Sequence, residues 1–208
     1  MYAFFKRFLD IAGSLMLIVL FSPAFLLIML AIAADSSGKS IFIQKRAGRY
    51  GRPFSIWKFR TMCQNAPANV ATNALYDPGR YITPVGRFLR RTSLDELPQL
   101  INILKGDMSF IGPRPVVLTE TELLSLRRQN GADRVRPGIT GLAQVRGRDD
   151  LDIRKKARYD AFYCRHMSLA LDIRIALRTI RCVISGDGIR EGTLRRAAPR
   201  RNKSKKWI

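Results

Sequence analysis

Two adjacent carboxylates, Asp95 and Glu96, precede an arginine, Arg114, that stands between two prolines. Neighbouring carboxylates suit phosphate chemistry, because one can attack a phosphorus atom while the other holds a divalent cation. Pro113 and Pro115 stiffen the backbone on both sides of Arg114, which would present its guanidinium in a fixed place. The combination indicates a site that acts on a phosphate group.

A structural interpretation of the same carboxylates competes with this one. Ser93 and Glu96 have the spacing of a capping box, in which the two side chains serve only to begin a helix. Pro98 disfavours this frame, which would place the proline beyond the first helical turn. If Pro98 instead opens the helix, Asp95 and Glu96 lie just before its positive end, which favours ionised carboxylates. The local pattern leaves both interpretations open.

A second acidic pattern, Asp150 and Asp152, resembles the Asp-x-Asp with which many nucleotide-sugar glycosyltransferases hold a metal. The same aspartates are N-cap candidates for a helix over 153–163, which is the preferred interpretation. A metal-dependent UDP-sugar glycosyltransferase remains an alternative enzyme class. The single histidine, His166, lies in no nucleophile-elbow pattern and is expected at a surface or an interface.

The chain is strongly basic, since 37 Lys and Arg against 16 Asp and Glu give a formal net charge of +21 over 208 residues. Such a charge demands an anionic partner, and nucleic acid, anionic lipid and phosphorylated substrates all qualify. The basic stretch 190–208 has little apolar content and is expected to be a flexible tail on lipid headgroups. Charge and tail also motivate a rival hypothesis, a membrane-tethered nucleic-acid-binding protein.

Near its N-terminus the chain carries an apolar run, Ile11 to Ala34, whose 24 residues include no charge. About 20 such residues suffice for a helix to cross a bilayer. Pro23 predicts a kink in the middle, and the Ser22 hydroxyl can bond back to Ile18 or Val19. Basic residues flank both ends, which is typical of the cytoplasmic side. A re-entrant helix satisfies both flanks, and a kinked single span is the alternative.

The remaining chain predicts an α+β fold, mostly helical with one short β-hairpin. Strands over 41–44 and 54–60 are joined through 48–51, and on the second strand Lys58 and Arg60 are expected to point together into a site. Residues 63–80 lack periodicity and are interpreted as a loop, a candidate lid.

Helices are predicted from apolar spacing and from their stop signals. Residues 98–105 end before Gly106, and residues 119–129 end before Asn130-Gly131. The segment 136–141 has turn chemistry, in which Gly138 and Gly141 would adopt conformations that other residues avoid. A helix over 169–184 combines a wide apolar face with three arginines, which is typical of a helix lying on an anionic membrane surface. A core-facing helix explains this pattern almost as well.

The motifs of the chain follow one another in a set order. They are Lys6-Arg-x-x-Asp10, Ser22-Pro23, Lys45-Arg-Ala-Gly-Arg49, Lys58-Phe-Arg-Thr-Met62, Arg90-Arg-Thr-Ser-Leu-Asp-Glu-Leu-Pro98, Lys105-Gly-Asp-Met-Ser109, Gly112-Pro-Arg-Pro115, Arg136-Pro-Gly-Ile-Thr-Gly-Leu-Ala-Gln-Val145 and Tyr159-Asp-Ala-Phe-Tyr163. Over residues 1 to 190 this order resembles the small monotopic phosphoglycosyl transferases, bacterial sugar transferases that begin glycoconjugate assembly on polyprenol phosphate.

The resemblance implies that a phosphosugar moves from a UDP-sugar to undecaprenyl phosphate, releasing UMP, at the cytoplasmic face of the bacterial inner membrane. It implies that Asp95 is the nucleophile that carries the phosphosugar covalently and that Glu96 is the acid associated with Mg²⁺. Anionic membrane lipid is a further expected partner, and nucleic acid is not. Five other residues fall on polar motif positions with expected substrate-binding roles: Lys58, Arg90, Arg114, Arg148 and Asp160.

The resemblance also favours the re-entrant form of the N-terminal helix, with its break at Ser22 and Pro23. The expected organisation is a re-entrant membrane helix over 1–34, a cytoplasmic catalytic domain over 35–189 and a basic tail over 190–208. Larger relatives fuse extra spanning helices ahead of this domain, so the sequence is expected to represent the minimal form.

Overall fold

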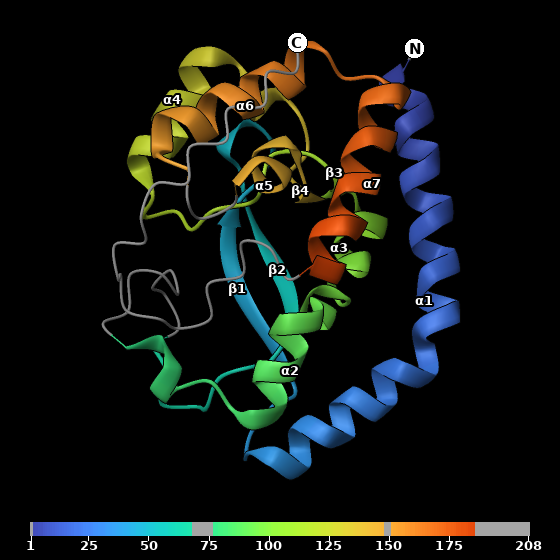
Figure 1. The fold of residues 1–208 in the computed structure, drawn as a ribbon, viewed down its shortest axis with the longest axis vertical. Helices are drawn as coiled ribbons and strands as arrows, with labels where there is room; N and C mark the ends of the chain where they lie inside the picture. The colour runs from blue at the N-terminus through green and yellow to red at the C-terminus, as the bar shows by residue number, and fades with distance from the viewer. Residues whose placement is uncertain (1, 68–76, 148–150, 186–208) are drawn as a thin grey trace.

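The computed structural model describes residues 2–67, 77–147 and 151–185. It is mostly helical with two small two-stranded sheets, which confirms the predicted α+β class (Figure 1). The helices and strands are α1 (Tyr2–Asp35), β1 (Ile41–Ala47), β2 (Pro53–Phe59), α2 (Pro84–Thr92), α3 (Gln99–Lys105), β3 (Ser109–Ile111), α4 (Thr121–Asn130), β4 (Gly138–Thr140), α5 (Leu142–Gly147), α6 (Ile153–Arg165) and α7 (Leu169–Ser185). Short 3-10 turns are η1 (Arg49–Gly51), η3 (Pro78–Arg80), η4 (Leu94–Glu96) and η5 (Ala132–Arg134).

Helix α1 contains the whole apolar run and begins well before it. By length and composition, α1 is long and apolar enough to cross a membrane. The helix bends in its middle (Figure 1), and Pro23 is its one proline. Ser22 Oγ donates to the Val19 carbonyl at 2.8 Å, as predicted, and so occupies a carbonyl at the break.

The two halves of α1 pack against the same folded domain. Before the break, Leu17 and Ile18 lie against the cluster that β2 and α3 form. After the break, Ile32 is buried with Phe59 of β2 and Leu89 of α2. The bend therefore lets one helix follow two faces of the domain while most of its large apolar side chains stay exposed.

Polar contacts hold both ends of α1. Near the start, Arg7 donates to the carbonyls of Ile103 and Leu104, the last turn of α3. At the other end, Arg60 donates to the Ser36 carbonyl at 2.6 Å. The prediction that Arg60 points with Lys58 into a site is therefore wrong, because its guanidinium caps the carboxyl end of α1.

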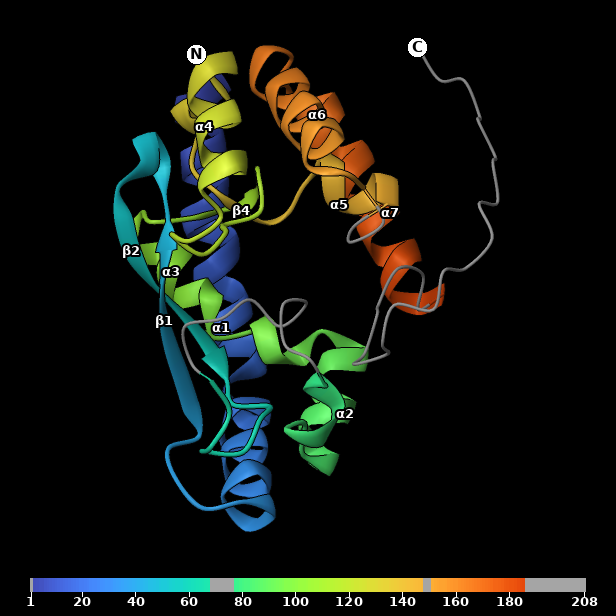
Figure 2. The same ribbon diagram turned by 90° about the vertical axis from the view of Figure 1, so that its left-hand side faces the viewer.

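The predicted hairpin is present, and its first strand is longer than expected. β1 and β2 pair antiparallel from Ile41 opposite Phe59 to Ala47 opposite Pro53. One face buries Phe54 and Ile56 against α3. In the turned view of Figure 2 the hairpin lies on one side of the molecule and α5, α6 and α7 on the other.

The second sheet replaces the turn that the sequence predicted over 136–141. β3 and β4 are parallel, with Ser109 opposite Gly138. Neither Gly138 nor Gly141 has positive φ, so the predicted reason for these glycines is wrong. A Cβ on Gly138 would lie 2.1 Å from the Gly112 nitrogen, and one on Gly141 would lie 2.1 Å from the Gly112 oxygen. Both glycines allow two backbones to approach closely.

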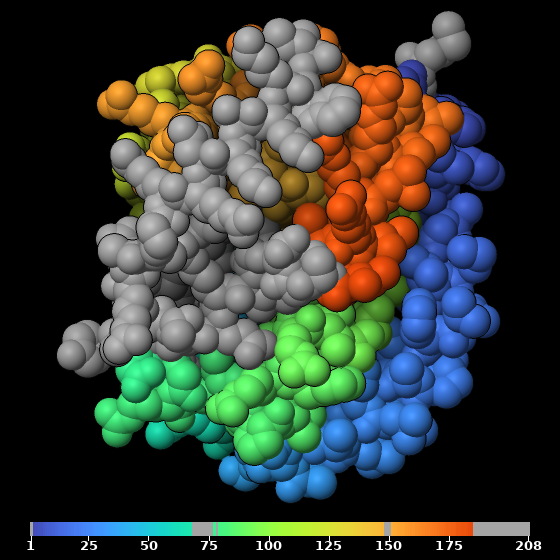
Figure 3. Space-filling model, viewed as in Figure 1, coloured from blue at the N-terminus to red at the C-terminus, as the bar shows by residue number. Residues whose placement is uncertain are grey.

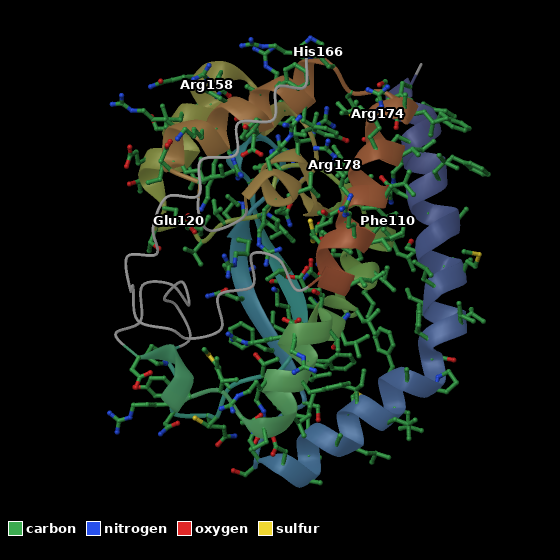
Figure 4. All side chains as sticks on the ribbon, in the orientation of Figure 1. Phe110, Glu120, Arg158, His166, Arg174 and Arg178 are labelled. Atoms are coloured by element: carbon green, nitrogen blue, oxygen red, sulfur yellow. The ribbon has the colours of Figure 1, made fainter. Side chains whose placement is uncertain are left out.

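Helix α7 carries apolar side chains on two sides. Ile175 is buried inward, whereas the outer side exposes a stripe that consists of Leu169, Ile173, Leu177, Ile180 and Ile184. Arg174 and Arg178 accompany this stripe (Figure 4). A helix that only faced a core would not need the outer stripe. In the space-filling view of Figure 3 the surfaces of α7 and α1 lie next to each other, and Lys6 of α1 pairs with Asp172 of α7 at 2.6 Å.

Candidate active site

The two carboxylates lie in a single 3-10 turn, η4, between helices α2 and α3. Thr83 is the N-cap of α2, and its hydroxyl accepts from the Gly86 amide at 3.0 Å. Ser93 follows the last residue of α2, has a φ of 58° and makes no side-chain cap to the next turn. The capping box, which was the competing structural interpretation, is therefore absent, and Pro98 precedes α3 as the other frame required. The turn leaves both carboxylates available for other partners.

Glu96 is clamped by two cations from different parts of the chain. Its Oε1 lies 2.9 Å from Lys58 Nζ of β2 and 2.8 Å from Arg114 Nη2. Burial alone would raise the pKa of Glu96, but the charges and hydrogen bonds of Arg114 and Lys58 hold it well below its ordinary value. Glu96 is therefore ionised at neutral pH.

Asp95 is held differently, although it is the adjacent residue. Its Oδ2 lies 4.0 Å from Lys58 Nζ, at the limit of an ion pair. Burial raises the pKa of Asp95, and the negative charge of Glu96 adds to the rise, while Lys58, Arg90 and Arg114 oppose it. Two like carboxylates thus have pKa values pushed in opposite directions, which is how neighbouring acids acquire different roles.

The structure brings four of the predicted site residues around Asp95. Lys58 and Arg114 reach the dyad directly. Arg90 of α2 acts on the charge of Asp95 and donates through Nε to Thr61 Oγ1 at 2.8 Å. Arg148 lies outside the described residues. A further cation, Arg46 of β1, belongs to one of the sequence motifs but was not predicted as a site residue, and its charge interacts with those of Glu96 and Arg114.

Asp160, for which a substrate-binding role is predicted, lies behind the loop of Arg114. Its side chain is 2% exposed and pairs with Arg127 of α4 at 2.7 Å. Arg127 also donates through Nη1 to the backbone carbonyl of Arg114 at 2.9 Å. Through Arg127, Asp160 therefore supports the loop that presents Arg114, and its contact with a substrate stays a prediction. No sequence signal distinguished Arg127 from the arginines of the surface.

Of the second acidic pattern, Asp150 and Asp152, the structure describes Asp152, which has a structural role. Asp152 Oδ1 accepts from the Lys155 amide at 2.7 Å and caps α6, as the preferred interpretation required. Asp150 lies outside the described residues. His166 is exposed at the carboxyl end of α6 (Figure 4), where its ring stacks on Phe162 with centroids 4.2 Å apart. Its surface position agrees with the prediction.

A cavity of about 260 Å³ lies behind the loop that carries Arg114. Pro113, Arg127 and Asp133 are among its lining residues, and neither Asp95 nor Glu96 is. The chemistry of the carboxylates therefore has to take place outside this cavity.

The carboxylates of Asp95 and Glu96 fit a magnesium ion only if the ion is bound together with a phosphate group. Within residues 2–67, 77–147 and 151–185 no group of three or more His, Cys, Asp or Glu side chains could hold a metal. Magnesium in phosphate-handling sites binds one or two carboxylates together with substrate phosphates and water. Asp95 and Glu96 supply two adjacent carboxylates, and both cation contacts of Glu96 use the same oxygen, Oε1. The pair suits an ion that arrives with a phosphate.

Comparison with known proteins defines the class to which this site belongs. Residues 1–186 match the family described as bacterial sugar transferase. The chain belongs to this family, as the order of its motifs predicted.

Curated relatives carry names that specify lipid-linked sugar transfer. One is the UDP-N-acetylgalactosamine-undecaprenyl-phosphate N-acetylgalactosaminephosphotransferase of Aeromonas hydrophila, 42% identical over 91% of this chain and 46% of that protein. Another is the UDP-glucose:undecaprenyl-phosphate glucose-1-phosphate transferase of Caulobacter vibrioides, 42% identical over 88% of this chain and 70% of that protein. A third is the undecaprenyl-phosphate galactose phosphotransferase of Salmonella typhimurium, 38% identical over 89% of this chain and 41% of that protein.

These relatives differ from the chain in length and from one another in the sugar that they name. The chain spans less than half the length of the Aeromonas and Salmonella proteins. Their names contain three different sugars, N-acetylgalactosamine, glucose and galactose, at similar identity. Overall similarity therefore identifies the reaction class of the relatives and does not select one sugar.

Proposed function

We propose that the chain transfers a sugar phosphate from a UDP-sugar to undecaprenyl phosphate or a similar polyprenol phosphate. The observation that carries this proposal is the unequal pair of carboxylates, in which Glu96 is fixed by Lys58 and Arg114 while Asp95 is desolvated and loosely paired. The names of the relatives support a UDP-sugar and undecaprenyl phosphate as the two substrates.

The reaction divides into two displacements at one phosphorus atom. The ionised carboxylate of Asp95 attacks the phosphate that bears the sugar, a bond forms from Asp95 to phosphorus, and the bond to the nucleotide phosphate breaks, so that UMP leaves. A phosphate oxygen of the polyprenol phosphate then attacks the same phosphorus and releases Asp95 as a carboxylate. A covalent intermediate lets the soluble and the lipid substrate use one site in turn.

The cations of the site serve the transferring phosphate. Lys58, Arg90 and Arg114 stand where negative charge accumulates during attack on a phosphate. Glu96 keeps Lys58 and Arg114 in place and is the residue that would hold Mg²⁺ with the diphosphate. When bound, the ion would neutralise charge on the transferring group.

The proposed topology is a re-entrant α1 that enters and leaves the cytoplasmic face of the bacterial inner membrane. Its support is that both ends of α1 are bound to one domain, at α3 through Arg7 and at the end of β2 through Arg60. A helix that crossed the bilayer would place these two ends about 30 Å apart on opposite sides. The exposed apolar stripe and arginines of α7 suit contact with the same anionic surface.

The decisive assay incubates the detergent-purified chain with undecaprenyl phosphate, Mg²⁺ and a panel of UDP-sugars, and identifies the nucleotide product. The proposal predicts UMP with at least one donor and none with Asp95→Asn. Release of UDP would instead indicate a glycosyltransferase. UMP release that persists in Asp95→Asn would exclude Asp95 as the nucleophile.

A further inference from the structure

Arg46 lies on the face of the hairpin that forms one wall of the site. Across the ladder it pairs with Phe54, two residues before Ile56 and four before Lys58. Side chains that alternate by two share a face, so Arg46 and Lys58 lie on the same side of the sheet. The next residue, Ala47, donates its amide to the Val116 carbonyl at 3.0 Å, which fixes the end of β1 beside the segment that follows Arg114.

The side chain of Arg46 contains a buried nitrogen that makes no hydrogen bond within the described residues, and burying an unpaired donor costs free energy. Its Nε is buried and has no hydrogen-bond partner in the part of the chain that the structure describes. Burial and the charge of Arg114 lower the pKa of Arg46 to about 10, while Glu120 and Glu96 act in the opposite direction. A buried donor without a partner usually marks the place of a ligand or of ordered water.

The charged side chains around Asp95 and Glu96 have a net positive charge, which favours the binding of an anion. Glu96 already shares its Oε1 between Lys58 and Arg114. Arg46 and Arg90 add two more cations, so that four positive side chains act on Asp95, Glu96 and Glu120. The surplus is positive, and two neighbouring guanidiniums with fixed planes are well suited to bind the oxygens of one phosphate.

The position of Arg46 favours the soluble substrate over the lipid. Glu120, which acts on Arg46, lies on the side of the domain away from α1 (Figure 4). Helix α3 packs against both β2 and α1, and β1 lies on the side of β2 away from α1 (Figure 1). A lipid phosphate would approach from α1, whereas a nucleotide would approach from the side that faces water.

We propose that Arg46, together with Arg114, binds the nucleotide-side phosphate of the UDP-sugar, the phosphate that leaves within UMP. The inference rests on the proposed function and extends it, because it assigns the leaving group a binding residue. Arg46 would stabilise the negative charge that appears on UMP when the bond between the two phosphates breaks.

The test compares Arg46→Gln with Lys45→Gln, since Lys45 is the adjacent cation on the opposite, exposed face of β1. UMP release is followed in a single turnover with UDP-sugar and without polyprenol phosphate. Product inhibition by UMP is measured in the full reaction. For Arg46→Gln both the rate of UMP release and the affinity for UMP should fall on the order of 10- to 100-fold, the loss of a charge-assisted hydrogen bond. Lys45→Gln should resemble the wild type, and Arg46→Lys should recover part of the loss.

Other outcomes separate this inference from the proposed function. A purely structural role predicts a lower unfolding temperature in Arg46→Gln with unchanged UMP affinity, and this result would overturn the inference. A loss confined to the second half-reaction, with a raised KM for polyprenol phosphate alone, would assign Arg46 to the lipid phosphate and also overturn it. If the wild-type chain turns over normally and Arg46→Gln does as well, the inference fails and the proposed function stands. If the wild type releases no UMP with any donor, the proposed function fails and the inference, which rests on it, fails with it.

Discussion

At the scale of single residues, the site separates two identical functional groups by their partners. Asp95 and Glu96 are adjacent carboxylates, yet Lys58 and Arg114 contact Glu96 closely, whereas among the described residues Lys58 alone pairs with Asp95, at 4.0 Å. A desolvated carboxylate with weak pairing keeps its lone pairs for an electrophile, whereas a clamped one is a fixed charge. The difference arises from neighbours 18 and 38 residues away in the chain.

The raised pKa of Asp95 predicts the acid side of the pH profile. As pH falls through that raised value, Asp95 becomes protonated and can no longer attack, while Glu96 stays ionised because its pKa is lowered. The acid limb of kcat/KM for the UDP-sugar should therefore lie above the ordinary value for Asp, which is about 4. Steady-state rates across pH give this limb.

Glu96→Gln supplies the control for that assignment. Its negative charge raises the pKa of Asp95, and its removal also leaves Lys58 to act on Asp95 alone. The residual activity of the variant should show an acid limb shifted to lower pH. A limb that stays in place or moves to higher pH would mean that Asp95 does not govern it.

At this scale the sequence predicted which residues come together better than it predicted their contacts. Asp95, Glu96 and Arg114 were singled out by their types and spacing, and the structure brings them into one site. The contacts of Arg60 and Asp160 could not be predicted, because polarity alone does not tell a ligand contact from a buried cap or ion pair. Each is polar and lies within a motif, but their partners, Ser36 and Arg127, are fixed only by tertiary packing.

At the scale of elements, Arg114 depends on a support that lies behind its backbone. Arg127 of α4 donates to the Arg114 carbonyl and pairs with Asp160 of α6. Removing one partner of a buried ion pair costs about 3–5 kcal/mol. Arg127→Met should lose about that much unfolding free energy and should lower kcat more than it raises KM.

The adjacent exposed arginine provides the matched control for this effect. Arg128→Met removes the same charge from the same helix without a buried partner, and should change unfolding free energy by less than about 0.5 kcal/mol. Denaturant unfolding of both variants measures the difference. Equal stability of the two would show that the Arg127–Asp160 pair does not support the loop.

The close approach of β3 and β4 leads to a second prediction, which concerns the loop that carries Arg114. A Cβ on Gly138 would lie 2.1 Å from the backbone nitrogen of Gly112, so Gly138→Ala must push the two strands apart. Gly131 has a φ of +77°, but its Cβ would first meet the flexible Arg134 side chain at 3.4 Å. Gly138→Ala should thus be much less stable than Gly131→Ala, which should lose only about 1–2 kcal/mol for a left-handed residue. Thermal unfolding compares them, and similar losses would contradict the close approach.

The helices and strands also show which parts of the fold could be predicted from the sequence and which could not. Helices α3 and α4 were predicted because Gly106 and Gly131 mark their ends locally, and both glycines have positive φ. The hairpin was predicted because its strands are close in sequence. The pairing of β3 with β4 joins three-residue strands separated by more than twenty residues, and neither has a periodicity that could be recognised.

At the scale of the whole molecule, the proposed contact of the site with a membrane depends on one bent helix, α1, and one domain. Both ends of α1 are tied to the domain, and α1 and α7, which both expose large apolar side chains, lie next to each other (Figure 3). The net charge of +21 favours contact with anionic lipid. A site carried by such a domain would lie at the level where a lipid phosphate meets a soluble nucleotide.

The re-entrant topology can be tested with introduced cysteines. In a variant without Cys63, Cys164 and Cys182, single cysteines at the exposed positions Ala3 and Lys39 mark the two ends of α1. A membrane-impermeant thiol reagent applied outside intact cells should label neither, and should label both after the membrane is opened. Labelling of one end in intact cells would establish a single span.

The central claim is that Asp95 carries the sugar phosphate between the two substrates. The most direct measurement incubates the chain with UDP-sugar and no lipid acceptor, stops the reaction and analyses its peptides by mass spectrometry. The account predicts that the peptide containing Asp95 gains the mass of one sugar phosphate, that Asp95→Asn gains none, and that polyprenol phosphate removes the added mass. A chain that turns over without this mass on Asp95 at any time would contradict the account.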